Sequence, residues 1–385
     1  MKCEKLFEKI EELYPEYVKV WEDICNIESP TGDKSGVDAV CSYLVKIAEE
    51  KNWETEIFTH PVAGNAACIT MNPKAVEAPV CLSGHMDTVH PVGMFGNPPV
   101  KIENGKIYGP GVIDCKGGIA AALLAMDALS QIGFSSRPVK LILQSDEETG
   151  SRTSGKETIR FMYEMAKGSV AFFNTESCAE ENRGTVVMER KGILRFNCEI
   201  KGKAAHSSKC NEGSSAVAEA AYKIIEFERM KNPDGLTFNC GVIEGGTVAN
   251  TVPAQCSFQV DIRFATEEEE KEAREIVQRI CNTSYVSGCT CNVKEISNRP
   301  PMEYSEKNFL LLDKINEIYK QNGLQPLKPR KAAGGSDAAY MTVYGIPCLD
   351  NIGVVGGGLH SIDEYSILSS IADSAKYMAA ATYLI

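Results

Sequence analysis

One carboxylate in this chain stands in a turn whose sequence restricts its backbone. Residues 109–118 read GPGVIDCKGG, and Asp114 is the carboxylate in this glycine-rich turn. Glycine adopts backbone angles that other residues avoid, and the small residues that follow indicate the start of a tightly packed helix. An Asp at such a place is also a common helix cap. The turn by itself therefore leaves metal binding and capping both open.

Two apolar stretches on either side of this turn read as strands that end in polar residues. The polar residues are His85 and Asp87 after the first strand, and Asp146, Glu147 and Glu148 after the second. Because open α/β sheets build their sites at the carboxyl ends of strands, we expect these side chains to converge on Asp114. Clustered carboxylates raise one another's pKa values unless a cation neutralises them. A metal ion is therefore expected, and nitrogen and oxygen ligands without thiolate suit zinc in a catalytic setting, with cobalt and manganese as the alternatives.

Five motifs in a fixed order resemble those of the dinuclear zinc aminoacylase/carboxypeptidase family of metallopeptidases. They are GHMDTV, GPGVIDCKGG, DEETG, NTES and GLHSIDEY, and the match extends from about residue 10 to the C-terminus. The resemblance implies that His85 and Glu176 hold one metal ion and that Glu148 and His360 hold the other. It also implies that Asp114 bridges the two ions.

The same resemblance implies that Glu147 is the general base and that Asp87 orients His85. Physical chemistry supports these separate roles of Glu147 and Asp87. Of two adjacent glutamates, one can bind a metal ion while the other stays free to carry a proton. Asp87 lies two residues from His85, so it can accept the second imidazole N–H and fix the tautomer. Taken singly, a His on an apolar strand is usually a core residue, and an acidic run is usually a solvated loop.

Further residues match family positions that bind substrate or stabilise an oxyanion. The resemblance assigns such roles to His206, Asn250 and Arg263, with His206 reaching into the active site of a partner subunit. Read without the resemblance, Asn250 is a structural turn residue and Arg263 is a surface charge or a salt-bridge partner. Gly335 and Ser336 precede a helix, where backbone N–H groups can meet a substrate carboxylate. A plain helix cap is the alternative for that segment.

Cys115, next to Asp114, is either a reactive thiol or a packed core residue, and packing is the favoured role. The resemblance implies a cis peptide bond between Asp114 and Cys115.

The composition narrows the class of protein. The 385 residues exceed what one hydrophobic core usually supports, so two domains are expected. Forty basic and fifty-two acidic residues give a net charge of −12 without a basic block, which argues against nucleic acid as a partner.

The N-terminal stretch has no apolar core of signal length, so neither export nor a membrane span is expected. Fifteen scattered cysteines without a CxxC motif favour reduced, buried thiols in a cytoplasm over disulfides or a structural zinc site.

The elements that must position these residues alternate between strand and helix. We predict helices at 4–27, 34–51, 117–132 and 153–167, and strands at 54–58, 65–71, 79–85, 139–145 and 170–174. This alternation predicts an α/β fold with a mixed, largely parallel sheet flanked by helices. From about residue 190 the order changes to β-α-β-β-α-β, which is ferredoxin-like. We therefore expect a catalytic domain of residues 1–189 and 299–385 and an inserted domain of residues 190–298. The resemblance implies that the insert is a lid and dimerisation domain.

These observations predict a cytoplasmic dinuclear zinc amidohydrolase or metallopeptidase that forms a homodimer through the insert. The expected substrate is a small peptide or N-acyl amino acid with a free carboxylate, from which a C-terminal amino acid such as glutamate is released. One alternative is a deacylase of N-acyl amino acids, of the acetylornithine or succinyl-diaminopimelate type. Another is an inactive, metal-bound binding paralogue. The presence of Glu147 argues against the second alternative, because a pure binder needs no free base beside its metals.

Overall fold

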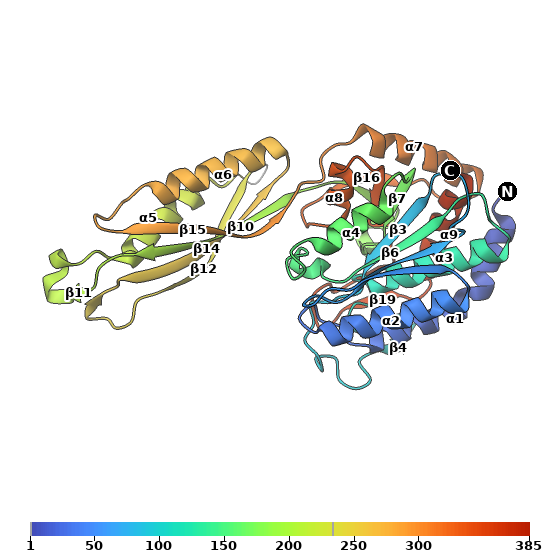
Figure 1. The fold of residues 1–385 in the computed structure, drawn as a ribbon, viewed down its shortest axis with the longest axis horizontal. Helices are drawn as coiled ribbons and strands as arrows, with labels where there is room; N and C mark the ends of the chain where they lie inside the picture. The colour runs from blue at the N-terminus through green and yellow to red at the C-terminus, as the bar shows by residue number, and fades with distance from the viewer. Residues whose placement is uncertain (1, 233–234) are drawn as a thin grey trace. The chain divides into compact units, whose positions relative to one another are not determined.

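The computed structural model describes residues 2–232 and 235–385 (Figure 1). Its contacts divide the chain into two units. The first comprises Met1–Met188, Tyr304–Lys331 and Ser336–Ile385, and the second comprises Glu189–Glu303 and Ala332–Gly335. The short segment Ala332–Gly335 joins the second unit because Lys191 donates its backbone N–H to Ala332 at 3.3 Å and Arg190 donates a guanidinium N–H to the Gly334 carbonyl at 2.9 Å.

The first unit is built around a mixed sheet of eight strands in the order β1-β2-β6-β3-β7-β17-β9-β16. The strands are β1 (Glu54–Phe58), β2 (Ala66–Met71), β3 (Val80–His85), β6 (Val139–Gln144), β7 (Ala171–Asn174), β9 (Thr185–Arg190), β16 (Lys328–Ala332) and β17 (Cys348–Asp350). The central neighbours β6, β3, β7 and β17 are parallel, whereas β1, β2 and β9 pair antiparallel. Every residue of β3 is buried, as expected for a central parallel strand.

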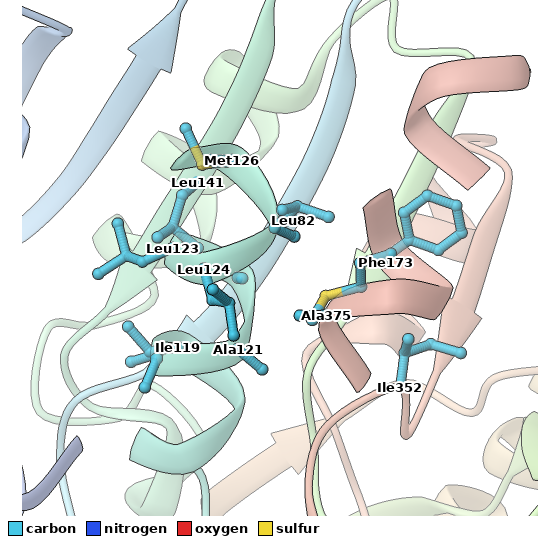
Figure 2. Packing of buried hydrophobic residues seen from close by; sticks show 14 of the residues in the cluster. Leu82, Ile119, Ala121, Leu123, Leu124, Met126, Leu141, Phe173, Ile352 and Ala375 are labelled. Carbon is cyan, nitrogen blue, oxygen red and sulfur yellow. The ribbon is translucent and has the colours of Figure 1, made fainter. Parts of the chain in front are cut away.

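Helices flank this sheet, so the predicted α/β class is confirmed. They are α1 (Glu4–Asn26), α2 (Lys34–Glu50), α3 (Lys116–Gln131), α4 (Glu157–Ala166), α7 (Glu306–Gln321), α8 (Ala338–Val343) and α9 (Ser370–Leu384), with short 3-10 turns η1 (Glu147–Thr149) and η2 (Glu180–Asn182). Helix α3 is buried on all sides from Lys116 to Leu129. It packs against α1, α9 and β3, and Figure 2 shows its side chains beside Leu82 and Leu141 of the sheet. An apolar helix of this kind is stable because neighbours cover every face.

A smaller sheet carries the loop in which His360 lies. Its strands are arranged in the order β4 (Lys101–Glu103), β5 (Lys106–Tyr108), β19 (Tyr365–Ile367), β18 (Val355–Gly357) and β8 (Cys178–Ala179). β18 and β19 pair antiparallel, so the loop between them is a hairpin connection. Gly356 is required there because a Cβ would lie 2.0 Å from the Tyr365 carbonyl oxygen. The close pairing of the two strands therefore fixes both ends of the loop.

The second unit contains a four-stranded antiparallel sheet in the order β12-β14-β10-β15. Its elements are β10 (Gly192–Lys201), α5 (Ala216–Arg229), β12 (Thr237–Gly245), β14 (Gln255–Phe264), α6 (Glu267–Asn282) and β15 (Thr290–Arg299), with the short pieces β11 (Ala205–His206), η3 (Ser207–Glu212) and β13 (Thr251–Val252). The predicted β-α-β-β-α-β order is confirmed. Buried and less buried residues alternate along β10, and the inner face contributes to a separate hydrophobic core.

Two general features of the sequence can be compared with this structure. In the described part of the chain, no helix combines the length and the apolar character needed to cross a membrane. The fifteen cysteines, all of which lie in the described part, are free. Twelve of them are buried. Most of the thiols are therefore packed in the interior, as the sequence predicted.

Candidate active site

Three neighbouring parallel strands bring polar residues to one edge of the main sheet. His85 is the last residue of β3, Glu147 and Glu148 lie in η1 just after β6, and Glu176 follows β7 by two residues. Parallel pairing places the carboxyl ends of these strands at the same edge. This is the edge at which open α/β sheets build their sites.

His85, Asp114 and Glu176 form a first group of ligand atoms. His85 Nε2 lies 3.1 Å from Asp114 Oδ1 and 3.8 Å from Glu176 Oε1. All three side chains are buried. One ligand atom from each lies within 4.8 Å of the others, so a single ion can contact all three.

Asp114, Glu148 and His360 form a second group. His360 Nε2 lies 3.3 Å from Asp114 Oδ2 and 3.5 Å from Glu148 Oε2, so Asp114 uses a different oxygen in each group. Ligand atoms about 2.1 Å from a tetrahedral ion are about 3.4 Å from one another. The separations observed here are close to that value. The nitrogen and oxygen donors therefore fit two divalent ions that share Asp114, and the structure brings together the five residues expected as ligands.

The pKa values of three of the five ligands, Glu176, Glu148 and His360, are displaced in a direction that a cation would reverse. Burial, followed by the charge of Asp114, raises the pKa of Glu176 well above its usual range. Burial also raises the pKa of Glu148 to about 8. Hydrogen bonds to Asp114 and Glu148 raise the pKa of His360 to about 10. A divalent cation favours the ionised form of buried carboxylates, which this arrangement otherwise disfavours.

Asp87 is fully buried, and it contacts several backbone and side-chain groups besides the imidazole of His85. His85 Nδ1 lies 2.9 Å from the carbonyl oxygen of Asp87 and 3.4 Å from its carboxylate. That carboxylate also accepts the backbone N–H groups of Glu147 at 3.1 Å and Glu148 at 3.2 Å, and the Thr31 hydroxyl at 2.6 Å. Asp87 therefore positions His85 and the two glutamates together, whereas the sequence predicted only the contact with His85.

The turn that carries Asp114 is held by α1 and α3. Trp21 on α1 donates its indole N–H to the Val112 carbonyl at 3.0 Å. Lys116, buried at the start of α3, donates to two carbonyl oxygens at and just beyond the C-terminal end of α1, at 3.0 and 2.8 Å. A cation is favourable there because that end of a helix carries partial negative charge.

Gly118 allows α3 to approach the chain segment that leads to Glu176. A Cβ at Gly118 would lie 2.2 Å from the carbonyl oxygen of Thr175, the residue before Glu176. The small-residue helix start seen in the sequence therefore serves a close approach between two elements that carry ligands. Gly111, on the other side of the turn, has a φ of +73°, a conformation that favours glycine.

Cys115 packs beneath the first ligand group. Its sulfur accepts the backbone N–H of His85 at 3.1 Å, and burial raises the pKa of the thiol to about 12. The thiol is therefore protonated at neutral pH, which supports the packing role over a reactive one. The peptide bond between Asp114 and Cys115 is cis, as predicted.

Glu364 and His90 form a buried pair that the sequence did not reveal. Glu364 Oε1 accepts the backbone N–H groups of Ile113 at 3.1 Å and Asp114 at 3.3 Å, and its Oε2 lies 2.6 Å from His90 Nε2. Glu364 follows His360 by four residues, so it ties the loop of one ligand to the turn of another. Its position inside the GLHSIDEY motif could have marked Glu364 as part of the site. No sequence motif contains His90.

In the second unit, His206 and Asn250 lie close together. β11 pairs with β13, which sets His206 opposite Thr251, and the Ser207 N–H donates to the Asn250 carbonyl at 2.9 Å. The His206 side chain is exposed, with its Nδ1 2.9 Å from the Ser208 hydroxyl.

Arg263 lies elsewhere in the same unit. It is near the last residue of β14, opposite Ile193, whereas β13 precedes the first residue of β14. At about 3.3 Å per residue, most of the length of β14 separates Arg263 from His206. The Arg263 guanidinium donates to Asp261 at 2.7 Å. The structure therefore places Arg263 in the salt bridge that the sequence offered as an alternative, and it does not bring Arg263 and His206 together within one chain.

Ser336 is fully buried and its hydroxyl has partners. Its Oγ accepts the Asn174 amide at 2.9 Å and the first backbone N–H of the short helix α8, that of Ala338, at 3.2 Å, although the N-cap position itself is Asp337. Gly335 is closely packed, since a Cβ would lie 2.8 Å from Arg299 Cδ. The capping alternative is thus present in the structure, and a substrate contact at Gly335 or Ser336 stays a prediction.

Comparison with known proteins agrees with this geometry. A family model described as Peptidase family M20/M25/M40 matches residues 81–383. Carboxypeptidase G2 of Pseudomonas sp. (strain RS-16) is 29% identical, over 97% of this chain and 90% of that protein. A LysW-lysine/LysW-ornithine hydrolase of Saccharolobus solfataricus is 27% identical, over 94% and 92%, respectively. Succinyl-diaminopimelate desuccinylase of Rickettsia felis is 25% identical, over 92% and 96%.

Solved structures share the fold. A tripeptidase from Staphylococcus aureus aligns with a TM-score of 0.79 at 22% identity, covering 96% of this chain and 98% of its own. An M20 family metallo-carboxypeptidase from Sulfolobus solfataricus aligns with a TM-score of 0.78 at 16% identity, covering 96% and 99%.

Proposed function

Since this chain belongs to peptidase family M20/M25/M40, we propose that it is a two-metal carboxypeptidase that releases a C-terminal amino acid, such as glutamate, from a small peptide or N-acyl amino acid. The resemblance seen in the sequence motifs is thereby confirmed at the level of the family. The observation that carries the proposal is the pair of ligand groups that share Asp114. The choice of a carboxypeptidase is supported by the 29% identity to Carboxypeptidase G2 over nearly the whole of both chains.

Zinc is the proposed metal, because imidazole and carboxylate donors in two groups of three suit catalytic zinc sites. The ligands would be His85 and Glu176 for one ion, Glu148 and His360 for the other, and Asp114 for both. When bound, such ions polarise a scissile carbonyl and make a water molecule more acidic. Cobalt and manganese accept the same donors and are the alternatives.

Glu147 is proposed as the general base. It is buried beside Glu148 and belongs to neither ligand group. A carboxylate next to a metal ligand can take a proton from the attacking water and give it to the leaving amine. Asp87 fixes the backbone of Glu147 and so acts as a positioning residue. A binding paralogue without turnover would not need this arrangement.

A homodimer through the second unit is part of the proposal. β12 is an edge strand of its sheet and packs against α5. Both elements expose apolar side chains: Ile225 on α5 is 47% exposed, and Val242 and Ile243 on β12 are 47% and 52% exposed. An unpaired edge beside apolar side chains is typical of an interface. The family resemblance of the sequence motifs is the support for a role of His206 in the active site of the partner subunit.

The setting proposed for this enzyme is the cytoplasm, with a small substrate and neither nucleic acid nor membrane as a partner. The support is that the cysteines in the described part of the chain form no disulfides, together with the net charge of −12.

A deacylase of N-acyl amino acids is the second candidate function. Its support is that two further relatives, a desuccinylase and a hydrolase of lysine and ornithine conjugates, also match over more than nine tenths of this chain. The same metal centre and base can cleave either kind of amide, so the difference lies in the substrate pocket.

A substrate panel with added zinc tests the proposal. We expect dipeptides and N-acyl compounds that end in glutamate to be hydrolysed, and the same compounds with an amidated C-terminus to be inert. A Glu147→Gln preparation, purified in the same way, controls for contaminating hydrolases. Preferred hydrolysis of acetylornithine or succinyl-diaminopimelate would favour the deacylase instead. Failure to hydrolyse any member with metal present would contradict both.

A further inference from the structure

We propose that the second unit holds a separate metal site, in which the thiols of Cys198, Cys281 and Cys291 bind one thiophilic d¹⁰ cation such as zinc or cadmium. This site is chemically distinct from the candidate active site, whose ligands are nitrogen and oxygen atoms. The proposal concerns residues of the second unit alone and does not depend on the substrate of the enzyme.

The spacing of the three sulfur atoms is that of a thiolate site. All three Sγ atoms lie within 4.8 Å of one another, and Cys198 Sγ lies 3.7 Å from Cys281 Sγ. In a tetrahedral site with Zn–S bonds of roughly 2.3 Å, the sulfur atoms are about 3.8 Å apart. Two of the three sulfurs therefore already have the separation that such an ion imposes.

Three different elements supply the cysteines, which is why no sequence motif marks them. Cys198 lies on β10, Cys291 on β15 and Cys281 at the C-terminal end of α6. In the pairing of the two strands, Cys198 is opposite Val293 and Cys291 is opposite Ile200. Because Cys198 and Ile200 are two residues apart, both cysteines point to the same face of the sheet. The end of α6 closes over that face. The absence of a CxxC motif therefore did not exclude a thiolate site.

A buried ammonium group lies beside the end of α6 that carries Cys281. Lys223 is buried nearby, where its ammonium donates to the Cys281 carbonyl at 3.1 Å and forms an ion pair with Glu219 at 2.9 Å. A nearby positive charge stabilises thiolate sulfur.

The exposure of the three cysteines decides from which side an ion can enter the site. Cys198 and Cys281 are buried and Cys291 is partly exposed, so an ion and a solvent ligand can reach the group from the side of Cys291. Each thiol gives up its proton as it binds, which leaves three thiolates around one divalent ion. Such an ion would join the end of α6 to β10 and β15, so binding should stabilise the folded second unit.

Cadmium is a suitable probe because thiolate-to-cadmium charge transfer absorbs in the ultraviolet, whereas nitrogen and oxygen ligands give no such band. The reduced full-length protein is titrated with Cd²⁺, and bound cadmium is measured after desalting. We expect the band to reach a plateau at one thiolate-bound ion per chain, in addition to the ions at the active site. Cys198→Ser, Cys281→Ser and Cys291→Ser should each lower the plateau at least tenfold.

Cys289→Ser is the matched control. Cys289 lies two residues from Cys291 but outside the group of three, so its substitution should leave the band unchanged. Retained hydrolytic activity identifies variants that have folded. The titration of the unaltered protein gives an answer even if a variant does not fold. No saturable band, or a band that survives all three substitutions, would overturn the proposal and leave the three thiols as a packed part of the core.

Discussion

At the scale of single residues, the most specific prediction is that Glu147 acts as the base while Glu148 binds a metal ion. Glu147→Gln should keep both metal ions and lose roughly 10²–10⁴-fold in turnover, because the amide cannot accept the proton. Glu148→Gln should instead weaken the binding of one ion. Metal content after dialysis and single-turnover rates separate the two effects. Identical behaviour of the two variants would show that the assigned roles are wrong.

Glu364 offers a second test at this scale, because it accepts the N–H of Asp114 without belonging to a ligand group. Glu364→Leu removes the acceptor and should lower metal affinity by about 10–100-fold, the usual effect of losing a group that orients a ligand. Glu364→Gln keeps an acceptor oxygen and should recover part of the affinity. Competition with a chelator measures both. Unchanged metal affinity in the Glu364→Leu variant would show that Glu364 does not help to position Asp114.

The residues that could be predicted from the sequence are those whose own motif carries the signal. The five expected ligands lie at the ends of apolar strands or in glycine-rich turns, and the structure gathers them. Glu364 and the bonds from Asp87 to the backbone of η1 were missed, because they depend on which chain segments meet in space. Local sequence does not encode such contacts between distant segments.

At the scale of elements, the close approach of α3 to the Glu176 segment is testable. Gly118→Ala would place a Cβ 2.2 Å from the Thr175 carbonyl oxygen. Overpacking of this kind costs about 1–3 kcal/mol of stability, and the shift should also weaken the metal group that contains Glu176. Gly32→Ala is the control, because nothing lies within 4 Å of a Cβ there. Chemical denaturation and metal titration of both variants provide the comparison. Equal stability and equal metal binding in the two variants would show that the close approach at Gly118 does not constrain the Glu176 segment.

Most predicted elements agree with the structure to within a few residues, and the largest difference has a physical cause. The helix expected from residue 153 begins at Glu157. Gly155 and Lys156 have φ values of +59° and +67°, which end any helical path through them. Asp146 holds this turn by accepting the backbone N–H of Ser154 at 2.7 Å. Helical periodicity in the sequence could not reveal a turn fixed by a side chain eight residues earlier.

At the scale of the whole molecule, the proposed role of His206 in the partner's active site requires a dimer. Mixing His206→Ala with Glu147→Gln, each inactive alone, should restore activity, because one site of a mixed dimer combines an intact Glu147 with the intact His206 of the partner. The control adds Ile243→Asp, which places a charge on the exposed edge strand β12 and should prevent both dimer formation and restoration. Light scattering gives the oligomeric state. Subunit exchange without restored activity would contradict a role for His206 across the interface.

The division into two units could be anticipated from the change in the order of the elements near residue 190, whereas a dimer was expected only from the family resemblance. His206 stands in a turn without neighbouring carboxylates in the sequence, and in the structure its side chain is exposed. A residue that acts on another chain leaves no trace in the contacts of its own. Its role therefore has to be tested in solution.

The central claim is that two divalent ions share Asp114, and metal titration of the demetallated enzyme tests it most directly. Protein stripped with a chelator should be inactive. Activity should return as zinc or cobalt is added and should level off at two ions per chain, with Asp114→Asn binding neither ion tightly. Full turnover in exhaustively demetallated protein, or an unchanged stoichiometry in Asp114→Asn, would contradict the account.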